Sequence, residues 1–444
     1  MSIQFVREEK FGTFPVRRHR LSNGLEIFLL RDTSAPVVSY HTWYKVGSRH
    51  EKHGKTGLAH LFEHLMFNET ENHKAGEFDR KLEENGAETN AATWVDWTFY
   101  YESVPADRVD LVVELESERM SKLVLREQQV TSEKEVVANE RRYRVEDDVE
   151  GAASELLYKT AFEKHPYHWP TIGWMEDIQA FTPEDCLAFY RTYYAPNNAS
   201  VIVVGDFEED ALLRMIDEKY GPLPSSSIPE DKFPPEPEQT SERRVTLKKP
   251  TPSAKVILGY KGPALDHPDH LALLIMNEIL FGGRAARIYR SLITEQEIAT
   301  DVRGWVSTFR DPGLVEFFVT GRAEIANDVL ETGLDREIAK LIEGGVDKHE
   351  MERAIARTEL AQLHGLETTS GRAEQIGFNA TVLNNINAGF ERLEELRALT
   401  PADILRVAKT YLVKDKRTVV WVEPSEETEE AGTDGETGTE EVEA

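Results

Sequence analysis

The feature that most constrains the fold of this 444-residue chain is a segment that occurs twice. FTPEDCLAFYRTYYAPNNASVIVVGD, from Phe181, aligns without a gap on LTPADILRVAKTYLVKDKRTVVWVEP, from Leu399, 218 positions later. In both copies a Thr cap and a Pro at the first helical position predict a helix, which a β-branched strand follows. Earlier in each half a predicted strand also precedes a predicted helix: 36–47 before 56–67, and 253–262 before 269–280. The chain is therefore predicted to contain two copies of one α+β unit.

A change in composition marks the boundary between these two copies. Residues 222–242 are rich in Pro, Ser and acidic groups and show no apolar period, which predicts a linker. We expect homologous units at 1–221 and 243–423, each with an antiparallel or mixed sheet and helices packed on one face. Residues 424–444 hold nine acidic groups and no Lys or Arg, which predicts a disordered, solubilising tail, with a docking motif as the alternative.

Charge and cysteine content limit the partners and the compartment. The net charge of −28 argues against nucleic acid or an anionic membrane as the main partner. Cys186 is the only cysteine, so no intrachain disulfide can form, which is typical of a reducing compartment. The chain shows neither a basic and apolar leader at its start nor roughly 18 consecutive apolar residues. We therefore expect a cytoplasmic protein that does not span a membrane.

The segment TGLAHLFEHLMFNET carries the chemistry of the first unit. It places His60, Glu63 and His64 at i, i+3 and i+4, so on a helix the three side chains share one face. Most of the residues around them are apolar, and burying three polar groups is costly unless they share a partner. Two imidazoles and a neighbouring carboxylate at this spacing indicate a zinc site.

A catalytic zinc ion needs a third protein ligand and leaves its fourth position to water. In VTSEKEVVANERRYR, Glu133 and Glu140 are separated by two helical turns and lie on one face. This pair can supply one ligand and one supporting carboxylate. The spacing alone is equally compatible with a solvated acidic helix face.

Together these residues resemble the pitrilysin/insulinase family of inverted-zincin metallopeptidases. The resemblance rests on 57–70, on TNAATWVDWTFYYESV, on SEKEVVANERR and on HPYHWPTIG, and extends over nearly the whole chain. It implies that His60, His64 and Glu140 bind Zn²⁺, that Glu63 is the general base, and that Glu133 orients a ligand. It also implies an edge strand that binds an extended peptide through Asn90, Ala91, Ala92 and Thr93. The implied activity is zinc-dependent endopeptidase cleavage of short or unfolded peptides, with one zinc per chain.

The second unit departs from the family pattern. Ile293 and Thr300 occupy the positions of an Arg and a Tyr that hold the substrate and the tetrahedral intermediate in active members. A shifted frame in which Arg290 is functional is the alternative reading. The departure predicts a heterodimer with a homologous subunit that carries the missing pair. A homodimer in which Arg287 or Arg290 substitutes for it is the other possibility.

Two further functions compete with a peptidase. The chain can be an inactive scaffold or assembly subunit of this fold, or a peptide-binding module in which zinc is structural. The first is disfavoured because all four metal-site residues are present. The second is disfavoured because structural zinc sites usually have four protein ligands.

Overall fold

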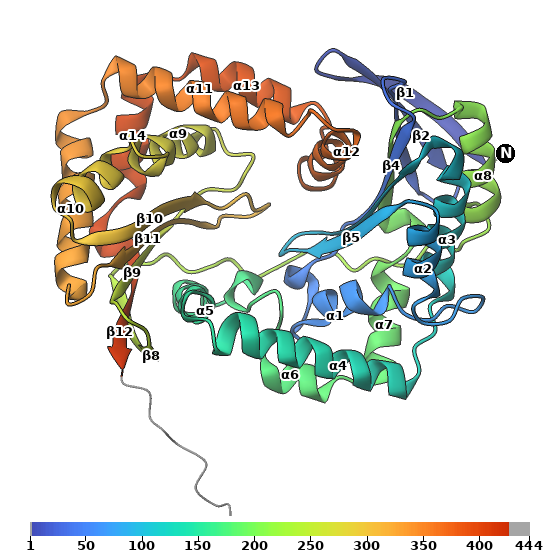
Figure 1. Ribbon diagram of the computed structural model, residues 1–444, viewed down its shortest axis with the longest axis horizontal. Coiled ribbons are helices and arrows are strands. Elements are labelled where there is room, and N and C mark those ends of the chain that lie inside the picture. The colour runs from blue at the N-terminus through green and yellow to red at the C-terminus, as the bar shows by residue number, and fades with distance from the viewer. Residues whose placement is uncertain (1, 426–444) are drawn as a thin grey trace, which may run out of the picture.

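The computed structural model describes residues 2–425 and contains two β-sheets on opposite sides of the molecule (Figure 1). The first sheet has seven strands in the order β1-β2-β3-β7-β4-β6-β5, so that β5 is an edge strand. Its strands are β1 (Ile3–Phe11), β2 (Phe14–Leu21), β3 (Glu26–Arg31), β4 (Val37–Tyr44), β5 (Glu88–Thr93), β6 (Thr98–Pro105) and β7 (Ala199–Gly205). Strand β7 is parallel to β3 and antiparallel to β4.

The second sheet repeats the topology of the first without the β1–β2 hairpin. Its order is β10-β11-β9-β12-β8, with β12 parallel to β8 and antiparallel to β9. Its strands are β8 (Arg243–Pro250), β9 (Lys255–Lys261), β10 (Ala299–Val306), β11 (Leu314–Gly321) and β12 (Arg417–Ser425). Strands β3 to β7 thus correspond in chain order to β8 to β12, and the edge strand β5 corresponds to β10. This confirms the α+β fold with an internal duplication.

The helices follow the same repeat. Helix α1 (Leu58–Leu65) and helix α9 (Asp269–Phe281) follow the corresponding strands β4 and β9. Helices α7 (Pro183–Tyr193) and α14 (Pro401–Tyr411) both begin with a capping box, formed by Thr182 with Asp185 and by Thr400 with Asp403. The other helices are α2 (Glu77–Glu84), α3 (Val109–Lys122), α4 (Glu127–Arg141), α5 (Val149–Ala161), α6 (Met175–Ala180), α8 (Glu209–Tyr220), α10 (Asn327–Gly344), α11 (Lys348–His364), α12 (Thr369–Phe378) and α13 (Ala388–Ala398).

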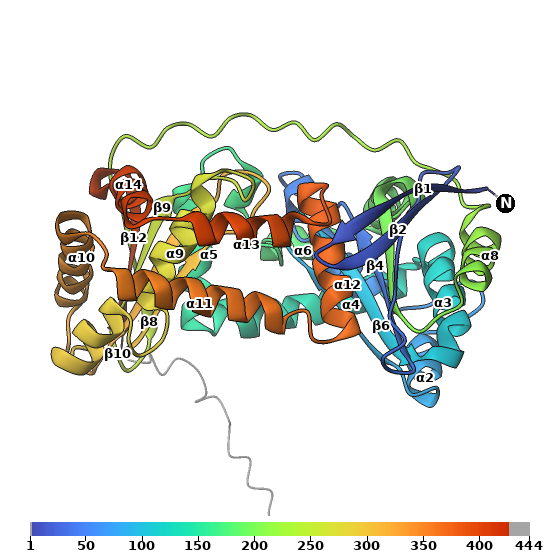
Figure 2. The ribbon, with the colours of Figure 1, turned by 90° about the horizontal axis from the view of Figure 1, so that it is seen from above.

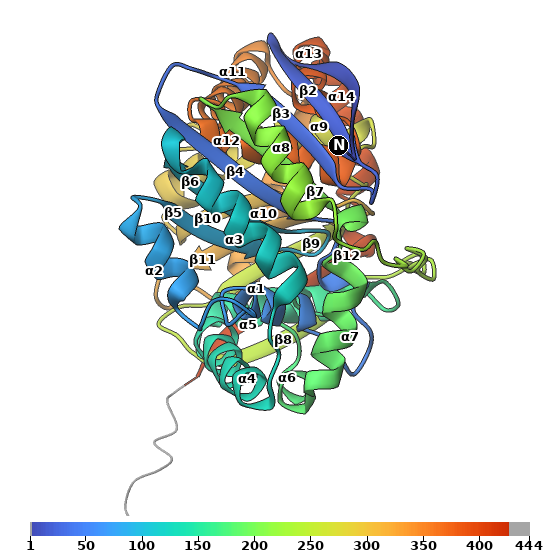
Figure 3. The ribbon, with the colours of Figure 1, turned by 90° about the vertical axis from the view of Figure 1, so that its right-hand side faces the viewer.

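The two halves exchange one helix each. On the first sheet, helices of its own half cover one face (Figure 3), and α12 of the second half packs against β4 and β7 on the other. On the second sheet, α9, α10 and α14 cover one face, and α5 of the first half packs against β8, β9 and β12. The prediction of helices on one face is therefore correct for each half taken alone. In the folded chain, a helix of the other half covers the second face of each sheet.

Residues 222–242 contain no helix or strand and run in an extended arch between the halves (Figure 2). The arch is anchored at two acidic side chains. Glu236 accepts hydrogen bonds from three successive backbone N–H groups, those of Glu163, Lys164 and His165, at 2.8, 2.9 and 3.0 Å. Asp231 forms ion pairs with Arg310 at 2.9 Å and with Arg49 at 3.4 Å. The segment therefore connects the two halves along a fixed path.

The predicted acidic tail begins two residues too early, because β12 runs through Ser425. The rest of that prediction, 426–444, lies outside the described residues. Within residues 2–425, no helix combines the length and apolar character that crossing a membrane requires. Cys186 is buried on α7, and burial raises the pKa of its thiol to about 12, so this thiol is unreactive.

The packing of α12 on the first sheet gives a stability prediction. Gly377 on α12 lies so close to Trp43 on β4 that an added Cβ would overlap the indole ring. We expect Gly377→Ala to destabilise the chain by about 1–3 kcal/mol, because a well-packed interface must shift to admit the methyl group. Gly344→Ala is the matched control, because a Cβ there meets nothing within 4 Å. Equal urea midpoints for the two variants would contradict the close packing of α12.

Candidate metal centre

The helix that carries the histidine motif is fixed at its N-terminus. Its N-cap, Gly57, has a φ of +95°, and a Cβ there would lie 2.5 Å from the carbonyl oxygen of Ile172. The buried carboxylate of Glu51 accepts hydrogen bonds from the N–H groups of Gly57 at 2.8 Å and Ala59 at 2.7 Å. These bonds satisfy N–H groups that have no partner within the helix. Glu51 was not predicted from the sequence, because it caps the helix from outside the usual N-cap position.

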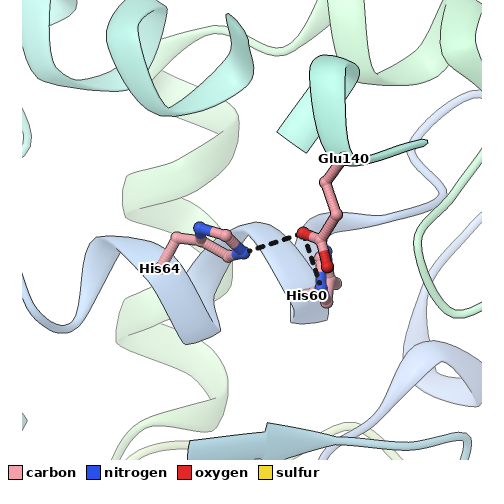
Figure 4. A group of neighbouring side chains, drawn as sticks. All are labelled: His60, His64 and Glu140. Atoms are coloured by element: carbon pink, nitrogen blue, oxygen red, sulfur yellow. Dashed lines mark ion pairs between the residues drawn. The ribbon is translucent and has the colours of Figure 1, made fainter. Parts of the chain in front are cut away.

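Two imidazoles on α1 and one carboxylate on α4 converge (Figure 4). Glu140 Oε2 lies 3.5 Å from His60 Nε2 and 3.3 Å from His64 Nε2. A tetrahedral zinc ion with bonds of about 2.1 Å separates its ligand atoms by roughly 3.4 Å, so both distances fit. Glu140 Oε2 is buried and forms no hydrogen bond with any described residue, as expected of an atom that binds a metal. The donor set therefore fits a zinc ion.

The protonation states of His60 and Glu140 suit a cation, and a metal ion would displace a proton from His64. Burial lowers the pKa of His60 to about 4, so its imidazole is neutral at pH 7 and has a lone pair for a metal. Burial also disfavours the charged form of His64, but the Glu140 carboxylate outweighs it and raises the pKa of His64. The same contact with His64 lowers the pKa of Glu140. Glu140 is therefore an ionised carboxylate.

Glu63 lies beside this group without belonging to it. Within residues 2–425, the side chains that converge closely enough to hold an ion are those of His60, His64 and Glu140 alone. Burial raises the pKa of Glu63, and the neighbouring Thr93 and His64 oppose the shift. The carboxyl group is thus outside the converging set and close to Thr93, the last residue of the edge strand β5.

Glu133 lies on the side of His64 that faces away from Glu140. Its Oε2 is 3.7 Å from His64 Nδ1, the ring nitrogen that faces away from Glu140, and its Oε1 accepts a hydrogen bond from Asn68 at 3.2 Å. A carboxylate in this position orients the imidazole of a metal ligand. The structure thus gives the two acidic residues of α4 different places: Glu140 among the converging atoms and Glu133 behind His64.

The four residues Asn90, Ala91, Ala92 and Thr93 lie on the edge strand β5, which within residues 2–425 pairs with β6 alone. Asn90 is exposed, Ala91 and Ala92 are half-buried and Thr93 is buried. Helix α1 packs against β5, so the open edge of the sheet and the converging ligands are neighbours. The other side of β5 offers backbone groups to an added strand.

The residues considered in the second half are not arranged as a substrate clamp. Ile293 packs against the core of the second sheet, and Thr300 is exposed on β10. Arg287 is held by Glu350 through two bonds of 2.7 and 2.6 Å and by the carbonyl of Gly345. Arg290 is exposed and lies 3.5 Å from Glu295. Arg287 is therefore already engaged within its own half.

Arg141, the residue after Glu140, joins three parts of the first half. Its guanidinium binds the carboxylate of Glu155 on α5 at 2.7 and 3.0 Å and the carbonyl oxygen of Gly173 at 2.8 Å. Gly173 in turn lies against Gly57, the N-cap of α1. Arg141 is buried, so these bonds fix the end of α4 relative to the start of α1. The distance between Glu140 and the two histidines depends on this junction.

We expect Arg141→Met to weaken zinc binding by about tenfold, because residues that support metal ligands typically contribute 10–100-fold in affinity. Competition with a chromogenic chelator measures the affinity, and circular dichroism checks that the variant is folded. Arg142→Met is the control, because Arg142 is exposed and, among the described residues, its side chain donates to Asn139 of α4. Equal zinc affinities in the two variants would show that the junction does not position Glu140.

Family models match both halves of the chain. The family described as insulinase, peptidase family M16, matches residues 26–173, and the one described as the peptidase M16 inactive domain matches residues 180–358. The half with the converging ligands thus matches the insulinase family. Within the described part of the second half, no group of side chains converges in this way.

Individual proteins are similar over almost the entire length. The zinc protease PqqE of Helicobacter pylori is 31% identical over 416 residues, covering 91% of this chain and 92% of that protein. The crystal structure of a protease from Helicobacter pylori matches with a TM-score of 0.88 and 30% identity, over 95% of this chain and 100% of that one. The periplasmic protease PqqL from Escherichia coli matches with a TM-score of 0.76 and 18% identity, over 95% of this chain but 48% of that one. The chain therefore belongs to the insulinase family of peptidases, peptidase family M16.

Proposed function

We propose that the protein is a zinc-dependent endopeptidase that hydrolyses short or unfolded peptides. The observation that carries the proposal is the arrangement of three converging ligand atoms with a fourth acidic residue, Glu63, beside them and outside the set. A structural zinc site usually has four protein ligands, whereas three ligands and a free carboxylate are typical of a hydrolytic site. The names of the similar zinc proteases support zinc as the metal.

Each residue then has a separate task. The edge of β5, with Asn90 to Thr93, binds the peptide in an extended conformation through main-chain hydrogen bonds. His60, His64 and Glu140 would hold a zinc ion, which would supply a Lewis acid for the scissile carbonyl and for the attacking water. Glu63 takes the proton from the attacking water and delivers it to the nitrogen of the leaving amine. Glu133 holds the ring of His64 in place.

We also propose that the chain works as one half of a heterodimer. The side chain of Ile293 has no hydrogen-bond donor, the Thr300 hydroxyl donates to backbone carbonyls of β11, and Arg287 is bound by Glu350. The match over 48% of PqqL supports a larger assembly, because it shows a chain about twice as long that contains this fold in half its length. A homologous partner with the missing Arg and Tyr would complete the site. The single buried cysteine supports a cytoplasmic location.

The test is cleavage of an unstructured fluorogenic peptide by the metal-free protein with and without one equivalent of Zn²⁺, in the presence of its partner. Activity that appears with zinc and disappears on chelation supports the proposal. A metal-loaded, partner-bound chain that binds the peptide without cleaving it would instead support the inactive, peptide-binding function.

A further inference from the structure

Arg144 lies beside the candidate metal centre and forms an ion pair with one of its ligands. Its Nε lies 2.8 Å from Oε1 of Glu140. The other oxygen of Glu140, Oε2, faces the Nε2 atoms of His60 and His64 at 3.5 and 3.3 Å. We propose that Arg144 is a positioning residue: it holds Oε1, so that Glu140 gives a metal ion one oxygen and leaves room for the attacking water. The inference rests on the proposed function and adds a residue to it.

The two oxygens of Glu140 have different surroundings. Oε2 is buried and forms no hydrogen bond with any described residue, whereas Oε1 is paired with the Arg144 guanidinium. A carboxylate can bind a metal ion through one oxygen or through both. Binding through both adds a ligand atom beside the position that a hydrolytic zinc site leaves to water. The ion pair opposes this, because Oε1 must move away from the guanidinium to approach the metal.

Arg144 pairs with Glu140 although other acidic residues are closer in the sequence. Glu146 and Asp147 follow Arg144 by two and three positions, but among the described residues the carboxylate within ion-pair distance of Arg144 is that of Glu140 alone. An exposed ion pair contributes little to stability. The Glu140 side chain, however, is only 18% exposed and belongs to the metal centre. The pair therefore acts on the position of one carboxylate oxygen.

The backbone of Arg144 is fixed by helix α5. Arg144 lies in a π-helical turn, Arg142–Glu146, that continues α4. Its carbonyl oxygen would lie 1.9 Å from a Cβ at Gly151 of α5, so only glycine permits this approach of the two backbones. The N–H of Gly151 also donates to the carboxylate of Asp148 at 2.6 Å, which caps α5. The side chain of Arg144 therefore extends from a turn whose path is fixed.

The experiment loads the metal-free protein with Co²⁺, whose visible absorption is stronger in a four-coordinate site than in a five-coordinate one. The unaltered protein should show the strong absorption of a four-coordinate site. In Arg144→Met the absorption should fall, because the second oxygen of Glu140 is then free to bind the metal. With zinc and the partner present, the kcat of peptide cleavage should fall about 10–100-fold with little change in KM, the usual effect of losing a group that supports a ligand.

Arg142→Met is again the control, because Arg142 is exposed in the same turn and its side chain donates to Asn139. It should keep the spectrum and the kcat of the unaltered protein. Arg144 is 69% exposed, so its replacement should leave the fold intact, which circular dichroism checks.

An unchanged cobalt spectrum in Arg144→Met, an equal change in Arg142→Met, or weak absorption in the unaltered protein would overturn the inference. A spectrum that changes in Arg144→Met alone, without cleavage of the peptide by any form of the protein, would support the positioning role and contradict the proposed peptidase activity.

Discussion

Glu63→Gln is expected to lower the kcat of peptide hydrolysis about 10²–10⁴-fold, the usual contribution of a general base, while the protein keeps its zinc. Glutamine has nearly the same shape but cannot accept the proton of the attacking water. The three converging ligand atoms belong to other residues, so coordination should be unaffected. The fold should also persist, because Glu63 is half-buried and an uncharged amide costs less to bury than a carboxylate.

Metal analysis and steady-state kinetics on the same preparation distinguish a loss of turnover from a loss of zinc. Glu135→Gln is the matched control, because Glu135 is an exposed acidic residue on α4, between Glu133 and Glu140. It should change neither zinc content nor kcat. A Glu63→Gln protein with unchanged turnover would remove Glu63 from the reaction, and one that loses its zinc would place it among the ligands.

Mixing the chain with its homologous partner is expected to raise kcat/KM about 10²–10³-fold over the chain alone, the loss usually seen when an oxyanion donor is removed. The reason is that Ile293 packs against the core of the second sheet, and the Thr300 hydroxyl donates to backbone carbonyls of the neighbouring strand β11. The partner to test is a homologous chain that lacks the histidine motif and carries the Arg and Tyr, to be sought among the neighbouring genes.

The mixing experiment has two informative controls. The partner combined with Glu63→Gln should stay inactive, which shows that the activity arises at the zinc site of this chain. The partner with its own Arg replaced by Met should no longer activate the chain. Full activity of the isolated chain, unchanged on mixing, would rule out a divided site and favour the homodimer.

The sequence predicted the parts of the fold that are encoded locally. The gapless repeat at Phe181 and Leu399 placed two helices with matching caps, and the order of strand and helix in each half predicted the duplicated α+β unit. The spacing of His60, Glu63 and His64 placed them on one helix. These features depend on residues within a few positions of one another, so they can be read without the tertiary structure.

Contacts between distant segments could not be predicted in this way. The spacing of Glu133 and Glu140 left open which of them faces the histidines, because that choice depends on how α4 packs on α1. The capping of α1 by Glu51 and the bonds of Arg141 with Glu155 and Gly173 also join separate elements. The exchange of α5 and α12 between the halves leaves no periodic signal in the sequence.

The most direct test of the central claim is a crystal structure of the zinc-loaded protein with anomalous diffraction data collected on both sides of the zinc absorption edge. Our account predicts a single anomalous peak per chain at about 2.0–2.2 Å from His60 Nε2, His64 Nε2 and one oxygen of Glu140, with Glu63 and Glu133 outside the bonding distance. A peak at another group of residues, or one bound by Glu133 in place of Glu140, would contradict it.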